Sequence, residues 1–202
     1  MPDKSVAEAI AAEDTFADLQ DYAWATESIN YLYRRGIVAG HGDGMFAPAN
    51  DVKREEFVKM LVLSFDILDE RAESTFDDCY ATDWSYPYIA SAQAQGLVTG
   101  YSNFFNRTQE ITRQDAAVMA YRFLSGMDFE IEGAELSFGD TEEIADYAVE
   151  AVSVLVACGI INGMDNGNFA PTEFCTRAQS AKIIFELSKL VESRRLSDAQ
   201  NT

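Results

Sequence analysis

The sequence predicts a mainly α-helical fold built from three similar repeats, each a helix, a glycine-rich loop and a second helix. An aromatic-x-acid motif recurs every 60 to 62 residues, at Phe16, Phe76 and Phe138. Apolar residues at helical spacing stand on both sides of a glycine pair in each copy. A unit of about 50 residues is too small to bury two helices by itself, so the repeats are expected to share a core.

Each repeat carries the same landmarks in the same order. The acid of the first motif is an aspartate: Asp18, Asp78 and Asp140. An aromatic residue comes next, as Trp24, Trp84 and Tyr147. Two glycines four positions apart follow, as Gly36 and Gly40, Gly96 and Gly100, and Gly159 and Gly163. A polar turn then leads to a phenylalanine, and an arginine opens the second helix, as Arg54, Arg113 and Arg177.

The periodicity also predicts where the helices lie. In the first helix the apolar residues are Trp24, Ile29, Leu32 and Tyr33 in repeat 1, and Tyr147, Ala151, Val152, Leu155 and Val156 in repeat 3. The first glycine of each pair is expected to end that helix just after its C-cap. In the second helix the apolar stripe is Phe57, Met60, Leu61, Phe65 and Leu68, and later Ile183, Ile184, Leu187, Leu190 and Val191. Polar segments at 69–74 and 126–135 are expected to connect the repeats.

The composition excludes several classes of function. The chain has 15 Lys+Arg against 34 Asp+Glu, and a net charge of −19 opposes binding to nucleic acid or anionic lipid. One histidine, His41, argues against a Ser-His-Asp triad, and three cysteines without C-x-x-C spacing argue against zinc. Cys79, Cys158 and Cys175 are expected to be packing residues. The Asp43-Gly44 and 165–168 segments are typical of turns rather than of calcium loops, so no metal or cofactor is expected.

The ordered landmarks resemble the S-layer homology family, whose repeats carry F-x-D, a Trp, G-(I/V)-(I/V)-x-G, a turn ending in F-x-P, and a T-R-A-E-like helix start. Here the central motif is at 36–40, 96–100 and 159–163, and Pro48 and Pro171 close the turn in the outer repeats. The resemblance runs from Phe16 to Leu190. It divides the chain into repeats at 16–68, 76–125 and 138–190, with a lead-in at 1–15 and a polar tail at 191–202.

The resemblance implies a fold and a function. Three such repeats are expected to pack with pseudo-threefold symmetry around a shared central helical bundle. The function implied is that of a non-catalytic module at the bacterial cell surface, which binds a secondary cell-wall polysaccharide bearing an anionic, pyruvylated sugar. The alternatives are a self-assembling structural module of a surface layer and a peptidoglycan-binding module. Acid pairs such as Glu55-Glu56 and Glu142-Glu143 are expected on solvated faces of so acidic a chain, so an enzyme is not predicted.

The repeated arginine is the central candidate for ligand binding. A cation in the first turn of a helix is disfavoured by the macrodipole by up to about 1 kcal/mol, so an anionic partner is expected. One candidate is the aspartate of the same repeat, which would pair Asp18 with Arg54. The other is a ligand carboxylate held jointly by the guanidinium and the helix N-terminal amides, which the resemblance favours.

Other landmarks have a structural and a ligand-binding interpretation. Thr112 and Thr176 fit capping boxes with Asp115 and Gln179, whereas Lys53 takes the threonine's place in repeat 1. The sequence favours a core position for Trp24 and Trp84, with a sugar platform as the alternative. It favours positive φ for the second glycines, with close approach of a ligand as the alternative. The predicted ligand-binding set is Arg54, Arg113, Arg177, Asp18, Asp78, Asp140, Trp24, Trp84, Tyr147, Gly40, Gly100, Gly163, Thr112 and Thr176. Because repeat 3 has Tyr147 and Gln179 in place of Trp and an acid, repeats 1 and 2 are expected to form the working grooves.

Overall fold

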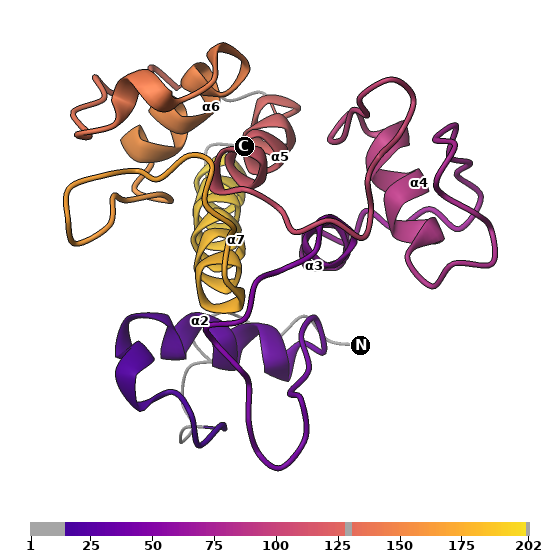
Figure 1. Cartoon of the computed structure of the whole chain (residues 1–202), viewed down its shortest axis with the longest axis horizontal. Coiled ribbons are helices and arrows are strands. Elements are labelled where there is room, and N and C mark those ends of the chain that lie inside the picture. Colours follow the sequence, from indigo (N-terminus) through magenta and orange to yellow (C-terminus); the bar gives the residue numbers. More distant parts are fainter. Residues whose placement is uncertain (1–14, 128–130, 201–202) are drawn as a thin grey trace. The chain divides into compact units, whose positions relative to one another are not determined.

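The computed structural model describes residues 15–127 and 131–200, and these residues form α-helices without a regular strand (Figure 1). The helices are α2 (Ala23–Arg34), α3 (Arg54–Ser64), α4 (Tyr86–Ala94), α5 (Arg113–Ser125), α6 (Asp146–Ala157) and α7 (Arg177–Gln200). Short 3-10 turns, η1 (Gln20–Tyr22) and η2 (Thr141–Glu143), precede α2 and α6. The predicted mainly α fold with three repeats is confirmed. Within the described ranges, no helix has both the length and the apolar character that crossing a membrane requires.

The chain divides into two compact units that do not follow the repeat order. One unit runs to Asn50 and resumes at Thr176, and the other comprises Asp51–Cys175. In the first unit α2 packs against α7, and in the second α3 packs against α4 and α5 against α6 (Figure 1). The second helix of each repeat therefore packs against the first helix of the next repeat, and α7 of repeat 3 returns to α2 of repeat 1. Because helices are paired between repeats, no single repeat contains a complete core.

Each first helix ends in the same glycine-dependent motif. The N–H of Gly36 donates to the carbonyl of Tyr33, and that of Ile37 to the carbonyl of Leu32. Equivalent pairs of bonds end α4 at Gly96 and α6 at Gly159. These three glycines have φ between +69° and +72°, which completes a Schellman motif and confirms the predicted helix ends.

The second helix of repeat 1 is shorter than its apolar stripe predicts. Phe57 and Leu61 are fully buried, but α3 ends at Ser64, and Asp66 adopts a φ of +55° just beyond it. Phe65 stacks on Phe123 with ring centroids 3.9 Å apart. Leu68 is exposed, so extending the helical stripe to this residue was wrong.

A ring of backbone hydrogen bonds relates the three repeats within the second unit. Val52, Ile111 and Cys175 each stand two positions before the arginine of their repeat, and all three are buried. Val52 N–H donates to Cys175, Ile111 N–H to Val52, and Cys175 N–H to Ile111, over 2.8–3.0 Å. These three segments are thus linked in one cycle of hydrogen bonds inside the second unit. The packing role predicted for Cys175 follows from its position there.

Candidate functional site

The three repeated aspartates hold the loops that follow the second glycines. The Asp18 carboxylate accepts the N–H groups of Phe46 and Ala47 at 2.9 and 2.7 Å. Asp78 does the same for 105–106, and Asp140 for 169–170. The second residue of each pair has a φ near +60°, which turns two successive N–H groups toward one carboxylate. The geometry favours a structural role for these aspartates, and their contact with a ligand stays a prediction.

The arginines whose charges act on Asp18 and Asp140 come from the preceding repeat, so the ion pair predicted within one repeat was wrong for these two aspartates. Arg177 is the cation whose charge acts on Asp18, and Asp140 lies close enough to act on Arg113. The physical reason is the pairing of helices between repeats, which carries each arginine to the loop of its neighbour. Partial burial alone would raise the pKa of Asp18. The N–H groups of Phe46 and Ala47, helped by Arg177, outweigh it and bring this pKa below its usual 3.8.

Each repeated arginine is fastened to the next loop in the same way. Nε donates to the carbonyl of the loop phenylalanine, from Arg54 to Phe105 at 2.9 Å, from Arg113 to Phe169 at 2.8 Å, and from Arg177 to Phe46 at 3.0 Å. The guanidinium carbon also lies 4.3–5.1 Å from the centroid of that phenylalanine ring. The carbonyl and the ring of the loop phenylalanine together hold the guanidinium plane in place. The sequence did not predict this phenylalanine as a partner of the arginine.

The three arginines differ in how accessible they are. Arg113 is only 6% exposed, and its Nη2 lies 3.5 Å from the carbonyl of Asn162. Burial lowers the pKa of this guanidinium. Arg54 and Arg177 are partly exposed, and Arg177 Nη2 donates to the carbonyl of Ala39 at 2.8 Å. A solvent-borne ligand therefore reaches Arg54 and Arg177 more readily than Arg113.

The N-terminal amides of the second helices are already bonded, which corrects the prediction that they hold a ligand. Arg54 and Glu55 N–H groups donate to the carbonyls of Gln109 and Arg107. The amides of 113–114 and of 177–178 find the same kind of partner in the next loop. At the third position, Asp115 and Gln179 N–H groups donate to the capping hydroxyls of Thr112 and Thr176 at 3.3 Å. The start of each second helix therefore binds a loop of the protein through its backbone amides.

The capping boxes differ between repeats. Repeat 3 has a complete box, because Gln179 Oε1 also accepts the N–H of Thr176 at 3.1 Å. Repeat 1 has half of one, in which Glu56 accepts the N–H of Lys53 at 2.8 Å. In repeat 2 the predicted reciprocal bond from Asp115 is replaced by contacts to Arg54 and Tyr147. The aspartate side chain is one methylene shorter than Glu56 or Gln179.

The repeated aromatic residues of the first helices lie at the surface. Trp24 and Trp84 are 51% and 52% exposed, and Tyr147 is 59% exposed, so the favoured core position of the two tryptophans was wrong. Trp24 and Tyr147 stand in the first turns of α2 and α6, where the inward face is taken by the smaller Ala25 and Ala148, and Trp84 lies in the turn just before α4. Lys59 Nζ lies 5.8 Å from the centroid of the Trp84 ring. Half-exposed indoles of this kind can stack on the apolar face of a sugar.

The second glycines are required by close packing and not by positive φ, which corrects the favoured interpretation. A Cβ added at Gly40 would lie 2.7 Å from Cε1 of Phe16 and 2.8 Å from the carbonyl of Met45. Gly100 faces Phe76 in the same way, and Gly163 faces Phe138. The phenylalanine of the aromatic-x-acid motif therefore lies against a bare backbone.

A chain of polar contacts joins three helices of the second unit around Asp115. Its Oδ2 lies 2.6 Å from Arg54 Nη1, and its Oδ1 accepts the hydroxyl of Tyr147 at 2.8 Å. Partial burial and the bond to Asp115 raise the pKa of Tyr147 to about 12. Although Arg54 and Tyr147 were predicted separately, Asp115 was predicted only as a helix cap.

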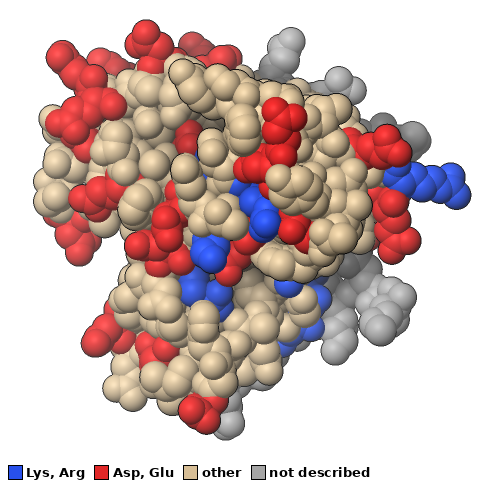
Figure 2. All heavy atoms as spheres, turned by 45° about the vertical axis from the view of Figure 1, so that its right-hand side comes forward, with Lys and Arg blue, Asp and Glu red and all other residues tan. Residues whose placement is uncertain are grey.

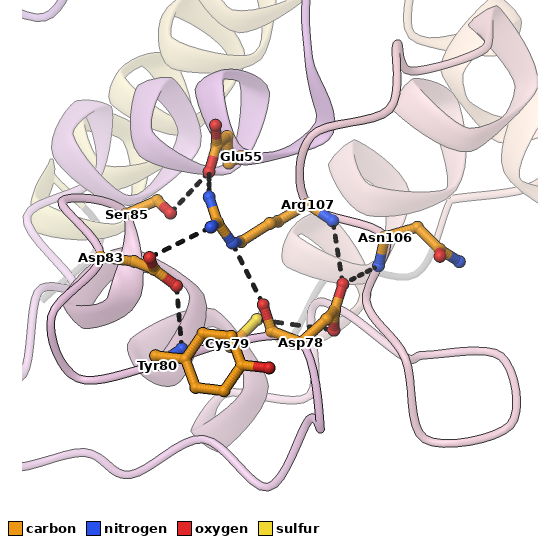
Figure 3. Close-up of polar contacts among 8 residues, drawn as sticks. All are labelled: Glu55, Asp78, Cys79, Tyr80, Asp83, Ser85, Asn106 and Arg107. Atoms are coloured by element: carbon orange, nitrogen blue, oxygen red, sulfur yellow. Dashed lines mark hydrogen bonds and ion pairs between the residues drawn. The ribbon is translucent and has the colours of Figure 1, made fainter.

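A second polar cluster surrounds Arg107, which stands where Pro48 and Pro171 close the other loops (Figure 3). Arg107 Nη1 pairs with Glu55 at 2.9 Å, Nη2 with Asp83 at 3.0 Å, and Nε donates to the carbonyl of Asp78 at 3.1 Å. Glu55 is 4% exposed and also accepts the hydroxyl of Ser85 at 2.7 Å, so its predicted place on a solvated face was wrong. The bond to Glu55 raises the pKa of Arg107. The missing proline was the one signal of this cluster in the sequence.

The surface charge agrees with the composition. Acidic side chains are spread over the face in Figure 2, and basic ones are few there. His41 and Asp43 are exposed in the first loop. Across the described residues, no group of three or more His, Cys, Asp or Glu side chains is placed to hold a metal ion.

Comparison with known proteins identifies the family of these repeats. The S-layer homology domain matches residues 15–58, 75–117 and 137–181. Exoglucanase XynX of Acetivibrio thermocellus is 35% identical over 176 residues, which are 86% of this chain and 16% of that protein. Amylopullulanase of Thermoanaerobacterium thermosulfurigenes is 34% identical over 178 residues, 87% of this chain and 10% of the relative. An S-layer protein of Bacillus thuringiensis subsp. finitimus is 29% identical over 183 residues, 89% of this chain and 22% of the relative.

The chain belongs to the S-layer homology family, as its repeated landmarks predicted. Modules of this family are non-catalytic, anchor proteins at the cell surface and occur in cell-wall proteins, which confirms the predicted location and the anchoring role. The chain spans between 10% and 22% of the three relatives described above.

Proposed function

We propose that this chain anchors its parent protein by binding a secondary cell-wall polysaccharide, and that the polymer's anionic, pyruvylated sugar is held by a repeated arginine. The proposal rests on one contact that Arg54, Arg113 and Arg177 share: Nε donates to a loop carbonyl, and the guanidinium lies over the phenylalanine ring of that loop. The Nε bond and the phenylalanine ring fix each guanidinium, so little conformational entropy is lost when an anion binds. The half-exposed Trp24 and Trp84 supply surfaces on which a pyranose ring can stack.

Co-sedimentation with purified cell walls tests this proposal. The full chain is expected to pellet with intact walls, and removing the pyruvyl groups should weaken the binding at least about tenfold, since a charged hydrogen-bonded pair contributes about 1.5–3 kcal/mol. Arg54→Ala and Arg177→Ala should each weaken binding to intact walls. Arg71→Ala is the matched control, because Arg71 is an exposed cation in the connection after α3.

Two other outcomes would redirect the function. Undiminished pelleting with walls stripped of all secondary polymer would favour peptidoglycan as the ligand. Assembly that depends on protein concentration and needs no polymer would favour a structural module of a surface layer, since S-layer proteins are among the relatives.

A further inference from the structure

Two departures from the repeat pattern contact each other in the second unit. Repeat 2 has Asp115 where the other repeats have Glu56 and Gln179, and repeat 3 has Tyr147 where the others have tryptophan. Glu56 and Gln179 reach back to the backbone N–H at their own helix start. Asp115 instead accepts the Tyr147 hydroxyl, a group that a tryptophan at that position would lack. The tyrosine and the aspartate therefore depend on each other.

The Asp115 carboxylate occupies the part of Arg54 that an anionic ligand would need. Nε of Arg54 is fixed on the Phe105 carbonyl, so an anion must approach the Nη edge. Asp115 Oδ2 already lies 2.6 Å from Nη1, and the hydroxyl of Tyr147 holds the other oxygen. The side chains of Arg54 and Asp115 are 13% and 28% exposed, so the pair is open to solvent on one side.

We propose that Asp115 and Tyr147 adapt the Arg54 site to an uncharged sugar residue and exclude a carboxylate from it. This inference rests on the proposed binding of a wall polysaccharide. Asp115 neutralises the guanidinium, and a second carboxylate at the Nη edge would face it within a few ångströms, where like charges repel strongly. Neighbouring sugar hydroxyls, in contrast, find donors on Arg54 and acceptors on Asp115. The carboxylate of the polymer then binds at the arginine of another repeat.

Asp115→Asn is the decisive substitution, because it removes the charge and keeps the size and one acceptor oxygen. In the full chain, acetate at constant ionic strength serves as the carboxylate probe, and the Nε–H resonance of Arg54 in NMR spectra reports its binding. We expect the Kd for acetate at this resonance to fall at least about tenfold in Asp115→Asn. Tyr147→Phe, which releases one oxygen of Asp115, should give a smaller decrease. Asp77→Asn is the matched control, since Asp77 is an exposed acid of the same repeat.

Fragments of the wall polymer with and without the pyruvyl ketal provide the second measurement. Asp115→Asn should raise the preference for ketal-bearing over ketal-free fragments at least about tenfold, and Arg54→Ala in the same chain should abolish that gain. Equal acetate affinity in the wild type and Asp115→Asn, or an unchanged preference between fragments, would overturn the inference. If no form of the chain binds either fragment, the proposed function fails, and the acetate titration still decides whether Asp115 keeps a carboxylate from Arg54.

Discussion

The repeated aspartate shows how much of one loop depends on a single carboxylate. Asp18 collects two successive N–H groups that the left-handed Ala47 turns toward it. Bonds of this kind favour the charged form, which is why its pKa lies below 3.8 although partial burial acts in the opposite direction. A group whose pKa is lower in the folded state stabilises the fold above its unfolded pKa. That stabilisation is lost as the pH falls through the folded pKa.

Asp18→Asn should therefore destabilise the chain in a pH-dependent way. At pH 7 we expect a loss of about 1–2 kcal/mol, because the amide replaces one acceptor by a donor that faces a backbone N–H. The difference from the wild type should narrow as the pH falls below 3.8, because Asp18 of the wild type then binds a proton in the unfolded chain before it does so in the folded one. Urea unfolding at several pH values from 7 to 3 measures both curves. Asp43→Asn, an exposed acid of the same loop, controls for net charge; a pH-independent difference would contradict the assignment.

At the scale of elements, charged side chains flank the contact between the start of α3 and the loop of repeat 2. Uncharged side chains flank the corresponding contact between the start of α7 and the loop of repeat 1. The Glu55 amide donates to the carbonyl of Arg107 at 3.0 Å, just as the Ala178 amide donates to Pro48 at 3.0 Å. The residues that form this backbone bond are the ion pair Glu55 and Arg107 at the start of α3, and the uncharged Ala178 and Pro48 at the start of α7. Glu55 is nearly inaccessible, so it requires Arg107 as its counter-ion.

This comparison predicts strong coupling between the two side chains. Arg107→Pro alone should destabilise the chain by about 3 kcal/mol, because Glu55 is left buried without its cation. Glu55→Ala alone should also destabilise it. The double variant reproduces Ala178 and Pro48, so its loss should be smaller than the sum of the single losses by at least about 1.5 kcal/mol. Urea unfolding of the four proteins closes the cycle, and additive losses would show that the pair acts independently.

For the whole molecule, the sequence predicted the helices and motifs of each repeat but not the contacts between the repeats. The two helices of each repeat, the glycines that end the first helix and the family could all be predicted, because they follow from the spacing of residues along the chain. The packing of each second helix against the next repeat could not be predicted, because three similar repeats offer similar first helices as packing partners. Two of the misassignments have the same cause, because the contact of Arg54 with Phe105 and the burial of Glu55 beside Arg107 both depend on which loop lies opposite the helix. Only the exceptions to the pattern, Arg107 and Tyr147, carried a signal of these contacts.

Because α7 of repeat 3 packs against α2 of repeat 1, we predict that these two helices fold as one unit. α2 packs against α7, and the ring of Tyr31 lies 5.0 Å from that of Phe185. In a chain ending at residue 175, the amides of Ile29 and Leu32 should lose their protection from hydrogen exchange, because the apolar face of α2 is uncovered. A peptide of residues 176–202 added in trans should restore it, and the same peptide with Phe185→Ala should do so more weakly. Full protection of α2 without the peptide would mean that repeat 1 buries its first helix unaided.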